Sequence, residues 1–589
     1  MKRFFQSFLG SMAAIWLSFL LLFVGLFVMI IAVSVSSASK SGKIIEIKKG
    51  SILLVDLSKD ISDRQVPVDI LTELQYGTSE TLALNNAVMA IDAAADDDRI
   101  DGIFIDAAGG SAGLAQSYEL MNAINRFKEK DKWVYAYSDN YTQGNYIIST
   151  VADSIFLNPI GAVDIHGLQS TSLYFKDMLD RLGIDVQVVK VGTYKSAVEP
   201  FLLNDMSEPA RQQQEVYLGN IWKSLADRMA KSRRLTVERI NRIADSIPAF
   251  RPADFLLKQK LVDKLVYRHE FEDMLKELTD HDELETISTD DYCAVNNVEK
   301  IGGGGDVKIG ILYAVGDITE DGEDGIASST LVPQILELAE DDEIDGLILR
   351  VNSGGGSAFA SEQIWEALEQ YKKLTKKPFY VSMGDVAASG GYYISCGADR
   401  IYAQPVTLTG SIGIFGMIPS AKTLFNEKLG INTATVSTNP SGQLPTLFEP
   451  MTPTMLASMQ SYVNNGYELF TSRVASGRKI SQDSVKVIGE GRVWDGAMAQ
   501  KIGLVDKLGG LDVAIRDMAT QLGATSYTLE EYPSLKLKWW QQLMSLDSEI
   551  SEHMTRSSLG EAYPLYRAVE RIKRMSVLQC RMTEYIIIN

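Results

Sequence analysis

An internal repeat constrains this 589-residue chain more than any other feature. Residues 133–167 align without a gap with residues 379–413, at an offset of 246 residues. Upstream of these stretches, "RIDGIFIDAAGGSAG" (99–113) resembles "EIDGLILRVNSGGGSA" (343–358). Because a chain of this length exceeds what one hydrophobic core supports, the repeat predicts two related domains.

Each copy alternates short apolar runs with helical patterns. "SILLVDL" (51–57) and "KIGILYAV" (308–315) open the copies as strands, and "SEQIWEALEQYKKL" (361–374) has its apolar residues at helical spacing. This alternation predicts parallel α/β layering. We expect a first repeat over 46–300 and a second over 301–589, joined by an acidic, glycine-rich linker at 278–306.

The N-terminal region, residues 1–45, has the sequence pattern of a membrane anchor. Residues 4–39 carry no charged side chain, and Lys2 and Arg3 precede them. This apolar stretch is long enough to cross a bilayer and too long for an ordinary signal-peptide core. We expect one transmembrane helix with the N-terminus in the cytoplasm and the remaining chain beyond the inner membrane. The alternative is a cleaved signal peptide ending near "VSSAS" (35–39).

Composition excludes several classes of function. The net charge of −19 argues against a nucleic-acid partner, which would require a basic face. Three cysteines without a CxxC pair give neither a disulfide framework nor a zinc site, so we predict no metal and no cofactor. The chain contains no GxxxxGK[ST] motif, so any activity is expected to proceed without nucleotide.

One candidate nucleophile and one candidate base stand in different copies of the repeat. Ser389 lies among small residues in "GDVAASGGYYIS" (384–395), and its counterpart in the first copy is Gln143. Lys195 lies in "GTYKSAVEPF" (192–201), and no lysine occurs from 432 to 455 in the second copy. This reciprocal loss predicts a single composite site, because neither copy retains both groups.

The chemistry of such a pair is that of acyl transfer. A serine hydroxyl is a weak nucleophile until a base takes its proton. A lysine at its ordinary pKa, about 10.4, is protonated at neutral pH, but burial lowers that pKa. The backbone N–H of Gly390, at the start of a predicted helix, and that of Gly355, in the glycine loop, are candidate donors to the developing oxyanion.

Four motifs in this order resemble the tandem-repeat form of the signal peptide peptidase A family: "GTYKSAVEPF", "NSGGGSA", "GDVAASGGYYIS" and "TGSIGIFG". These are membrane-anchored serine proteases of the Clp-protease/crotonase superfamily. The resemblance implies two Clp-protease/crotonase-like repeats, with Ser389 as nucleophile and Lys195 as general base. It implies that Ser411 orients the lysine, although a simple turn serine is the alternative. One departure is Gly354, where the family commonly has proline.

The resemblance also implies a substrate, a location and an assembly. The substrates would be released signal peptides and other apolar peptides, cleaved on the periplasmic side of the inner membrane. The assembly would be a homotetramer, a bowl with its sites facing inward. Two other functions stay open from the residues alone: a non-hydrolytic acyl-transfer enzyme and an inactive membrane scaffold. His166, which aligns next to Ser411, is an alternative base.

Overall fold

The computed structural model describes residues 46–65, 81–301, 304–322, 325–439, 446–534 and 578–582, with Met12, Trp16 and Gly25 as isolated positions. Its contacts separate residues 1–48 from residues 49–589, and the second unit contains everything described below. Apart from these three isolated positions, the predicted membrane anchor lies outside the described residues. Within those residues, no helix combines the length and the apolar composition that a membrane crossing requires.

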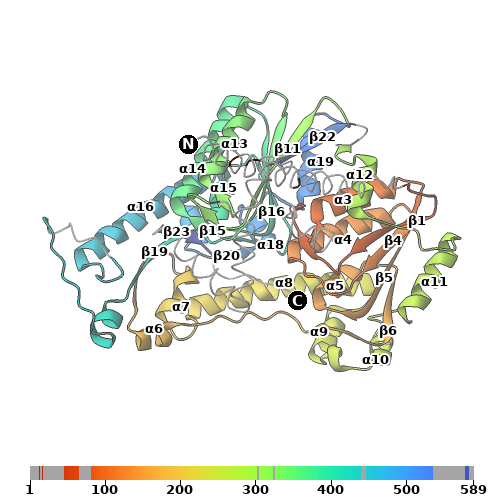
Figure 1. Cartoon of the computed structure of the whole chain (residues 1–589), viewed down its shortest axis with the longest axis horizontal. Helices are drawn as coiled ribbons and strands as arrows, with labels where there is room; N and C mark the ends of the chain where they lie inside the picture. Colours follow the sequence, from red (N-terminus) through yellow and green to blue (C-terminus); the bar gives the residue numbers. More distant parts are fainter. Residues whose placement is uncertain are drawn as a thin grey trace, which may run out of the picture. The chain divides into compact units, whose positions relative to one another are not determined.

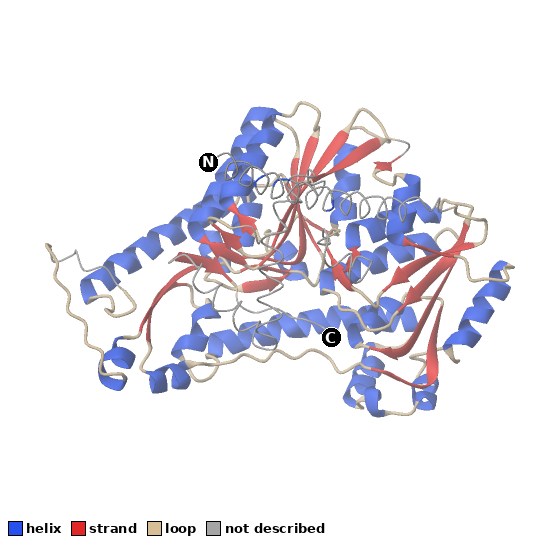
Figure 2. Ribbon diagram, viewed as in Figure 1, coloured by secondary structure: helices blue, strands red, loops and turns tan. Residues whose placement is uncertain are grey.

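The first repeat is built on a six-stranded sheet in which every pair of neighbours is parallel. Its central strand β4 has four consecutive buried residues, Gly102 to Ile105, as expected for a strand covered on both faces. Figure 2 shows helices flanking this sheet. In spatial order the strands are β8 (Lys264–Leu265), β6 (Ser154–Val163), β5 (Trp133–Tyr141), β4 (Ile100–Asp106), β1 (Ser51–Asp56) and β9 (Thr286–Ser288).

The second repeat rebuilds the same sheet from the equivalent strands. The matching parallel order is β21 (Lys507–Leu508), β17 (Arg400–Ala403), β16 (Phe379–Ala388), β14 (Gly346–Ser353), β11 (Lys308–Val315) and β22 (Tyr527–Tyr532). Additional strands extend it: β10 (Lys300–Ile301), β18 (Leu408–Gly410) and β20 (Val493–Asp495). The equivalence shows that the repeated sequence codes for a repeated topology.

The helices are duplicated in the same way. In the first repeat they are α3 (Leu84–Ala95), α4 (Leu114–Lys128), α5 (Gln143–Ser149), α8 (Glu208–Arg233) and α11 (Arg268–Thr279). Their counterparts are α13 (Ser328–Glu340), α14 (Ala358–Thr375), α15 (Gly390–Ser395), α16 (Pro453–Arg478) and α19 (Leu511–Gln521). Shorter helices fill the intervals: α6 (Lys176–Leu182), α7 (Glu199–Leu202), α9 (Val237–Asp245), α10 (Ala253–Lys258), α17 (Gln482–Ile488) and α18 (Gly496–Lys501).

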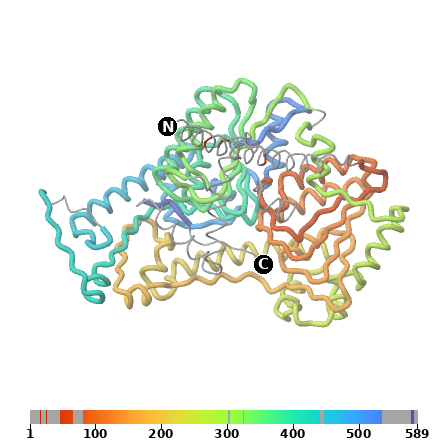
Figure 3. Tube along the Cα trace, viewed as in Figure 1, coloured from red at the N-terminus to blue at the C-terminus, as the bar shows by residue number. Residues whose placement is uncertain are grey.

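A third sheet joins the two repeats. Strand β7 (Asp185–Val191) leaves the first repeat and pairs antiparallel with β19 (Ile414–Ser420) of the second over its whole length. Figure 3 shows this part of the first repeat running beside segments of the second. The remaining strands, in order from the far edge, are β13 (Ile326–Ala327), β12 (Ile318–Thr319), β15 (Gly355–Ser357) and β23 (Leu578–Arg581), which lies next to β19.

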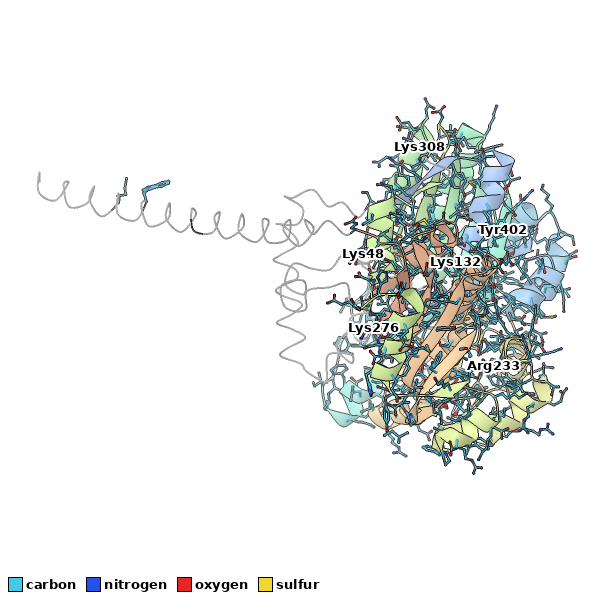
Figure 4. The ribbon with its side chains drawn as sticks, turned by 90° about the vertical axis from the view of Figure 1, so that its right-hand side faces the viewer. Lys48, Lys132, Arg233, Lys276, Lys308 and Tyr402 are labelled. Atoms are coloured by element: carbon cyan, nitrogen blue, oxygen red, sulfur yellow. The ribbon has the colours of Figure 1, made fainter. Side chains whose placement is uncertain are left out.

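Helix α8 also connects the two repeats (Figure 1). At its middle, Asn220 donates from Nδ2 to Asp495 Oδ2 of the second repeat at 2.9 Å. At its C-terminus, Arg233, labelled in Figure 4, pairs with Asp263 of the first repeat at 2.8 Å. With 26 residues and a rise of about 1.5 Å per residue, α8 is long enough to act as a rigid strut between them.

Much of the segment 278–306, which we expected to be a linker, belongs to the first repeat. Residues 286–288 form β9 at the edge of the first sheet, and α12 (Thr289–Asn296) follows directly. Ile287 and Tyr292 are buried and anchor this segment. The boundary between the repeats at 300/301 stays a prediction.

Candidate active site

Ser389 occupies a sharp turn between β16 and α15. Its backbone has φ 55° and ψ −113°, a conformation that a residue with a side chain rarely adopts. Two hydrogen bonds hold the turn: Ser389 N donates to the Gly410 carbonyl at 2.8 Å, and Tyr393 N donates to the Ser389 carbonyl at 2.8 Å. Glycine is required after it, because a Cβ on Gly390 would lie 2.7 Å from Ser361 Oγ. The turn therefore presents the hydroxyl at the end of the strand.

Lys195 reaches Ser389 from the loop that follows β7. Its Nζ lies 2.7 Å from Ser389 Oγ, 3.0 Å from Ser411 Oγ and 3.1 Å from the Ser411 carbonyl oxygen. Its side chain is 1% exposed and Ser389 is fully buried. The structure thus brings together the three side chains that the sequence predicted, from two repeats and across 194 residues of sequence.

The loop that carries Lys195 is held tightly against the second repeat. Tyr194 N donates to the Glu490 carbonyl at 2.9 Å. Gly491, with φ 75°, approaches so closely that a Cβ there would lie 2.7 Å from Lys195 Cβ. Gln213 of α8 donates from Nε2 to the Tyr194 carbonyl at 3.0 Å and accepts from Val493 N at 3.2 Å. These three contacts hold the backbone of Tyr194 and Lys195 in place.

Burial lowers the pKa of Lys195 to about 7, and the nearby Cys580 opposes this shift. A neutral amine has two N–H donors and one lone pair. When both donors face the Ser411 hydroxyl and carbonyl oxygens, the lone pair is left for the Ser389 O–H. Ser411 is itself held with φ 52°, and its N–H donates to the Arg492 carbonyl at 2.7 Å.

The two candidate oxyanion residues lie against each other. A Cβ on Gly355, whose φ is 96°, would lie 2.6 Å from Gly390 N. Gly355 therefore packs directly against the backbone N–H of Gly390, the first residue of α15. The Gly355 N–H donates to Ser353 Oγ at 3.1 Å, so it would have to leave or share that acceptor to bind an oxyanion. The roles of Gly355 and Gly390 as oxyanion donors stay predictions.

In the first repeat, the position equivalent to Ser389 is filled by a polar side chain. Gln143, in place of the serine, is buried and donates from Nε2 to the Gly167 carbonyl at 2.8 Å. Its Oε1 accepts from the N–H groups of His166 and Gly167 at 2.8 and 3.0 Å. The His166 ring is half exposed and pairs with Asp164 at 2.8 Å. The structure therefore does not bring His166 to Ser389.

Sequence reasoning missed the residues that support the site. Gln213 lies in the polar run "RQQQEV" (211–216), where nothing in the pattern separates it from its exposed neighbours. A buried charged cluster was also missed: Arg350 contacts Asp63 and Glu119 of the first repeat at 2.7 and 2.8 Å. Arg350, a charged residue within the apolar strand β14, is the signal that could have indicated the cluster. No group of side chains that could hold a metal ion occurs within the described residues.

A buried hydroxyl beside a buried amine, with backbone amides close by, can attack a carbonyl carbon and transfer its acyl group. Comparison with known proteins narrows the possible acyl-transfer activities to that of a protease. The profile of peptidase family S49 matches the chain twice, at residues 126–283 and 371–525. The chain belongs to this family, and the two matches confirm the predicted duplication.

Several curated relatives span most of the chain. Protease 4 of Haemophilus influenzae is 35% identical over 523 residues, 83% of this chain and 82% of that protein. Protease 4 of Salmonella typhi is 33% identical over 86% of this chain and 84% of its own. A chloroplastic serine protease SPPA of Arabidopsis thaliana is 29% identical over 80% of this chain and 69% of its own. The predicted family resemblance is confirmed.

A solved structure of a ClpP1 variant from Listeria monocytogenes is similar over 35% of this chain and 93% of its own, at 14% identity. Its TM-score of 0.24 is too low for any argument about this chain. The α/β fold and its duplication rest on the sheets described above.

Proposed function

We propose that the chain is a serine endopeptidase that uses a Ser389/Lys195 dyad. The observation that carries the proposal is the 2.7 Å contact between Lys195 Nζ and Ser389 Oγ, with both residues buried. A lysine whose pKa is about 7 is partly neutral at physiological pH, so it can accept the serine proton.

The reaction follows from the placement of the groups. Lys195 takes the proton of Ser389 as the hydroxyl oxygen attacks a peptide carbonyl carbon. The amides of Gly390 and Gly355 stabilise the negative charge on the carbonyl oxygen. Lys195 then protonates the departing amine, leaving an ester on Ser389. Water, deprotonated by the same lysine, hydrolyses that ester.

A fluorophosphonate probe tests the nucleophile, because only an activated serine reacts with it. We expect the wild-type chain to be labelled at Ser389 and to hydrolyse an unfolded apolar peptide. Ser389→Ala should abolish labelling and lower kcat/KM at least ~10³-fold, since the acyl-enzyme route is lost. A Ser389→Ala variant that kept a tenth of the wild-type turnover would rule out Ser389 as the nucleophile. Absence of labelling in a well-folded wild-type chain would favour an inactive scaffold or a non-hydrolytic enzyme.

The proposed substrates are released signal peptides and similar apolar, unfolded peptides. A relative from Enterococcus faecium, 34% identical over 39% of this chain, carries the name putative signal peptide peptidase. The site also supports this substrate class, because the walls around Ser389 come from buried strands and small residues. Efficient digestion of a stable folded protein, or a strict preference for a charged residue at the cut, would contradict it.

We further propose that the protein is anchored in the inner membrane by residues 1–45, with both repeats on the periplasmic side. The uncharged stretch 4–39 and the preceding Lys2 and Arg3 support this topology. The chain should stay in the membrane fraction after alkaline carbonate extraction. Protease added to spheroplasts should digest the repeats, and their protection would reverse the proposed topology.

The proposed assembly is a homotetramer. Several large apolar side chains of the second repeat are exposed in the single chain, including Leu429, Ile431, Val436 and Tyr462. Contiguous exposed apolar patches are typical of interaction surfaces, and Leu429, Ile431 and Val436 come from one stretch of the chain. Light scattering in mild detergent should give four times the chain mass of 65.0 kDa. A monomer at micromolar concentration would contradict the assembly.

A further inference from the structure

A second serine of the second repeat, Ser353, packs against the residues that follow Ser389. It is the last residue of β14, and β15 begins two residues later. A Cβ on Gly391 would lie 2.5 Å from the Ser353 carbonyl oxygen and 3.4 Å from Ser353 Cβ. Gly391 belongs to the first turn of α15, which lies beside β15 (Figure 1). The Ser353 side chain is therefore enclosed next to the turn of the nucleophile, and it is 2% exposed.

The hydroxyl of Ser353 accepts one hydrogen bond, from Gly355 N at 3.1 Å. Within the described part of the chain, no acceptor receives the proton of this hydroxyl. The buried hydroxyl of Ser395 differs in this respect, because it donates to the Gly391 carbonyl at 2.6 Å. A buried donor without an acceptor costs free energy, and such a group in a native structure calls for an explanation such as a catalytic role. An oxygen brought by a substrate would supply the missing acceptor.

The first repeat has no hydroxyl at the position of Ser353. When the glycine loops are aligned at the offset of 246 residues, Gly109 corresponds to Gly355 and Ala107 to Ser353. The loop keeps its shape in both copies, since Gly109 has φ 95° and Gly355 has φ 96°. The shape of the loop therefore does not require the hydroxyl. Like Ser389, Ser353 occurs only in the copy that contains the candidate nucleophile.

The hydrogen bond from Gly355 to Ser353 bears on how a substrate oxygen would be held. A backbone N–H that is directed at Ser353 Oγ is poorly aligned for a second acceptor, because hydrogen bonds weaken as they depart from linearity. A serine hydroxyl can accept from one group and donate to another, and hydrogen bonds in such a chain strengthen one another. Serine hydroxyls are among the side-chain donors that stabilise the oxyanion in acyl transfer.

We infer that Ser353 is a further catalytic residue, whose hydroxyl donates to the oxyanion formed when Ser389 attacks a peptide carbonyl. This inference rests on the proposed Ser389/Lys195 function. The Gly355 N–H then acts on the oxyanion through Ser353, while the Gly390 N–H donates to it directly. The proton of Ser353 stays on its own Oγ throughout, so the proton transfers between Ser389 and Lys195 are unchanged.

Steady-state kinetics of Ser353→Ala on an unfolded apolar peptide test the inference. The hydrogen bond to the oxyanion forms only in the transition state, so kcat should fall about 100-fold while KM changes by less than about twofold. Ser353→Thr keeps a hydroxyl and should retain at least about ten times the kcat of Ser353→Ala. Equal losses of kcat in the Ala and Thr variants would overturn the inference, and so would a Ser353→Ala chain that is as active as the wild type.

Ser395→Ala is the matched control variant. Ser395 is also buried, and its hydroxyl donates to the Gly391 carbonyl within α15. In the first repeat, Ser149 makes the equivalent bond to the Asn145 carbonyl at 2.8 Å, so this bond belongs to the fold and not to the reaction. Ser395→Ala should lower the Tm and leave kcat within about threefold of the wild type. A loss of kcat in Ser395→Ala as large as that in Ser353→Ala would overturn the inference, because packing of α15 would then explain both.

A peptide aldehyde and the corresponding peptide alcohol separate the role of Ser353 in the transition state from substrate binding. The aldehyde forms a hemiacetal with Ser389 whose oxygen takes the place of the oxyanion, whereas the alcohol binds without a covalent bond. Ser353→Ala should weaken inhibition by the aldehyde about as much as it lowers kcat/KM, and should leave inhibition by the alcohol unchanged.

The same two inhibitors distinguish failure of the inference from failure of the proposed function. Equal weakening of both inhibitors in Ser353→Ala, or no weakening of either, would overturn the inference and leave the Ser389/Lys195 peptidase standing. A well-folded wild-type chain that neither cleaves the peptide nor binds the aldehyde would show that the proposed function itself fails.

Discussion

Lys195 illustrates how one side chain can change its chemistry by position alone. In the loop after β7 it is buried beside two oxygens of Ser411 and one of Ser389, with no carboxylate among these contacts to hold a positive charge. Desolvation therefore outweighs the other effects and lowers its pKa from 10.5 to about 7. At neutral pH a large share of Lys195 is therefore uncharged, as the proposed role of general base requires.

The pH profile of peptide hydrolysis reports this lysine. We expect kcat/KM to rise with pH through about 7, as Lys195 loses its proton. Lys195→Met, which is similar in volume, should abolish hydrolysis together with this acid limb. A Lys195→Met variant that kept appreciable activity and the wild-type limb would require another base.

The same shift has a consequence for stability. Between about pH 7 and 10.5 the unfolded chain holds a proton on Lys195 that the native chain has lost. The free energy of unfolding should therefore rise with pH across this window, and the gain should be absent in Lys195→Met. Urea unfolding at pH 7 and pH 9.5 measures the difference between the two chains.

At the scale of the element, α8 holds the loop that carries Lys195, the proposed base. Gln213 is buried and bridges the Tyr194 carbonyl of the lysine loop and Val493 N of the second repeat. Gln213→Ala leaves both groups without this partner, which costs about 1–3 kcal/mol of stability. It should also lower kcat/KM by about 10- to 100-fold, because the lysine is displaced from Ser389. Gln212→Ala, at an exposed neighbouring position, is the control and should change neither quantity.

A second element, β16, is fixed to the first repeat by a carboxylate. Asp385 Oδ1 accepts from Ala115 N at 2.7 Å, at the N-terminus of α4. Asn352 donates to Asp385 and to Asp63, and Arg350 pairs with Asp63 and Glu119. Asp385 lies four residues before Ser389 in the chain. Its contacts with the first repeat therefore help to align Ser389 with Lys195.

This cluster predicts a pH dependence of opposite sign to that of Lys195. Burial, together with Asp63, raises the pKa of Asp385 from 3.8 to about 6. Between these values the native chain holds a proton that the unfolded chain has lost, so stability should fall as pH rises from 4 to 6. Glu119, whose pKa burial raises to about 7, acts in the same direction.

Asp385→Asn removes one of the two titrating groups. We expect the Tm of this variant, measured by differential scanning fluorimetry, to rise relative to the Tm of the wild type as pH increases from 4.5 to 7.5. Asp139→Asn, at the equivalent and exposed position of the first repeat, is the matched control and should follow the wild type. A parallel pH response of Asp385→Asn and the wild type would show that Asp385 is ionised throughout.

At the scale of the whole molecule, the candidate site is built from both repeats. Strand β7 and helix α8 extend from the first repeat onto the second, and Lys195 lies between them. Each repeat alone contains a complete parallel sheet but only one of the two reacting groups. The first repeat thus contributes Lys195 to the candidate site, and the second contributes Ser389.

Mixing two inactive variants tests whether the site forms within one chain. Lys195→Ala and Ser389→Ala chains, unfolded together and refolded as a mixture, should remain inactive, because each chain lacks one half of its own site. Recovery of a substantial fraction of the wild-type activity would show instead that the lysine of one chain serves the serine of another. Wild-type chain refolded in the same way is the control.

Local order along the chain was readable from the sequence. The strands, the glycine loop and the turn at Ser389 depend on apolar periodicity and on glycine at fixed positions, both of which are short-range properties. The duplication was readable because two copies can be compared with each other. The alignment also pointed to Ser389 and Lys195, since each is missing from the other copy.

Contacts between distant segments were decided only by the tertiary structure. Residues 278–306 read as a linker because acidic composition says nothing about Ile287 and Tyr292, which the first repeat buries. Gln213 and Arg350 acquire their roles from partners far away in sequence, and so does the strand at 578–581. The pKa of Lys195 belongs to this second group, because burial is a property of the folded chain and not of its order of residues. The sequence by itself determined which groups could react, and the packing of one repeat on the other determined that they meet.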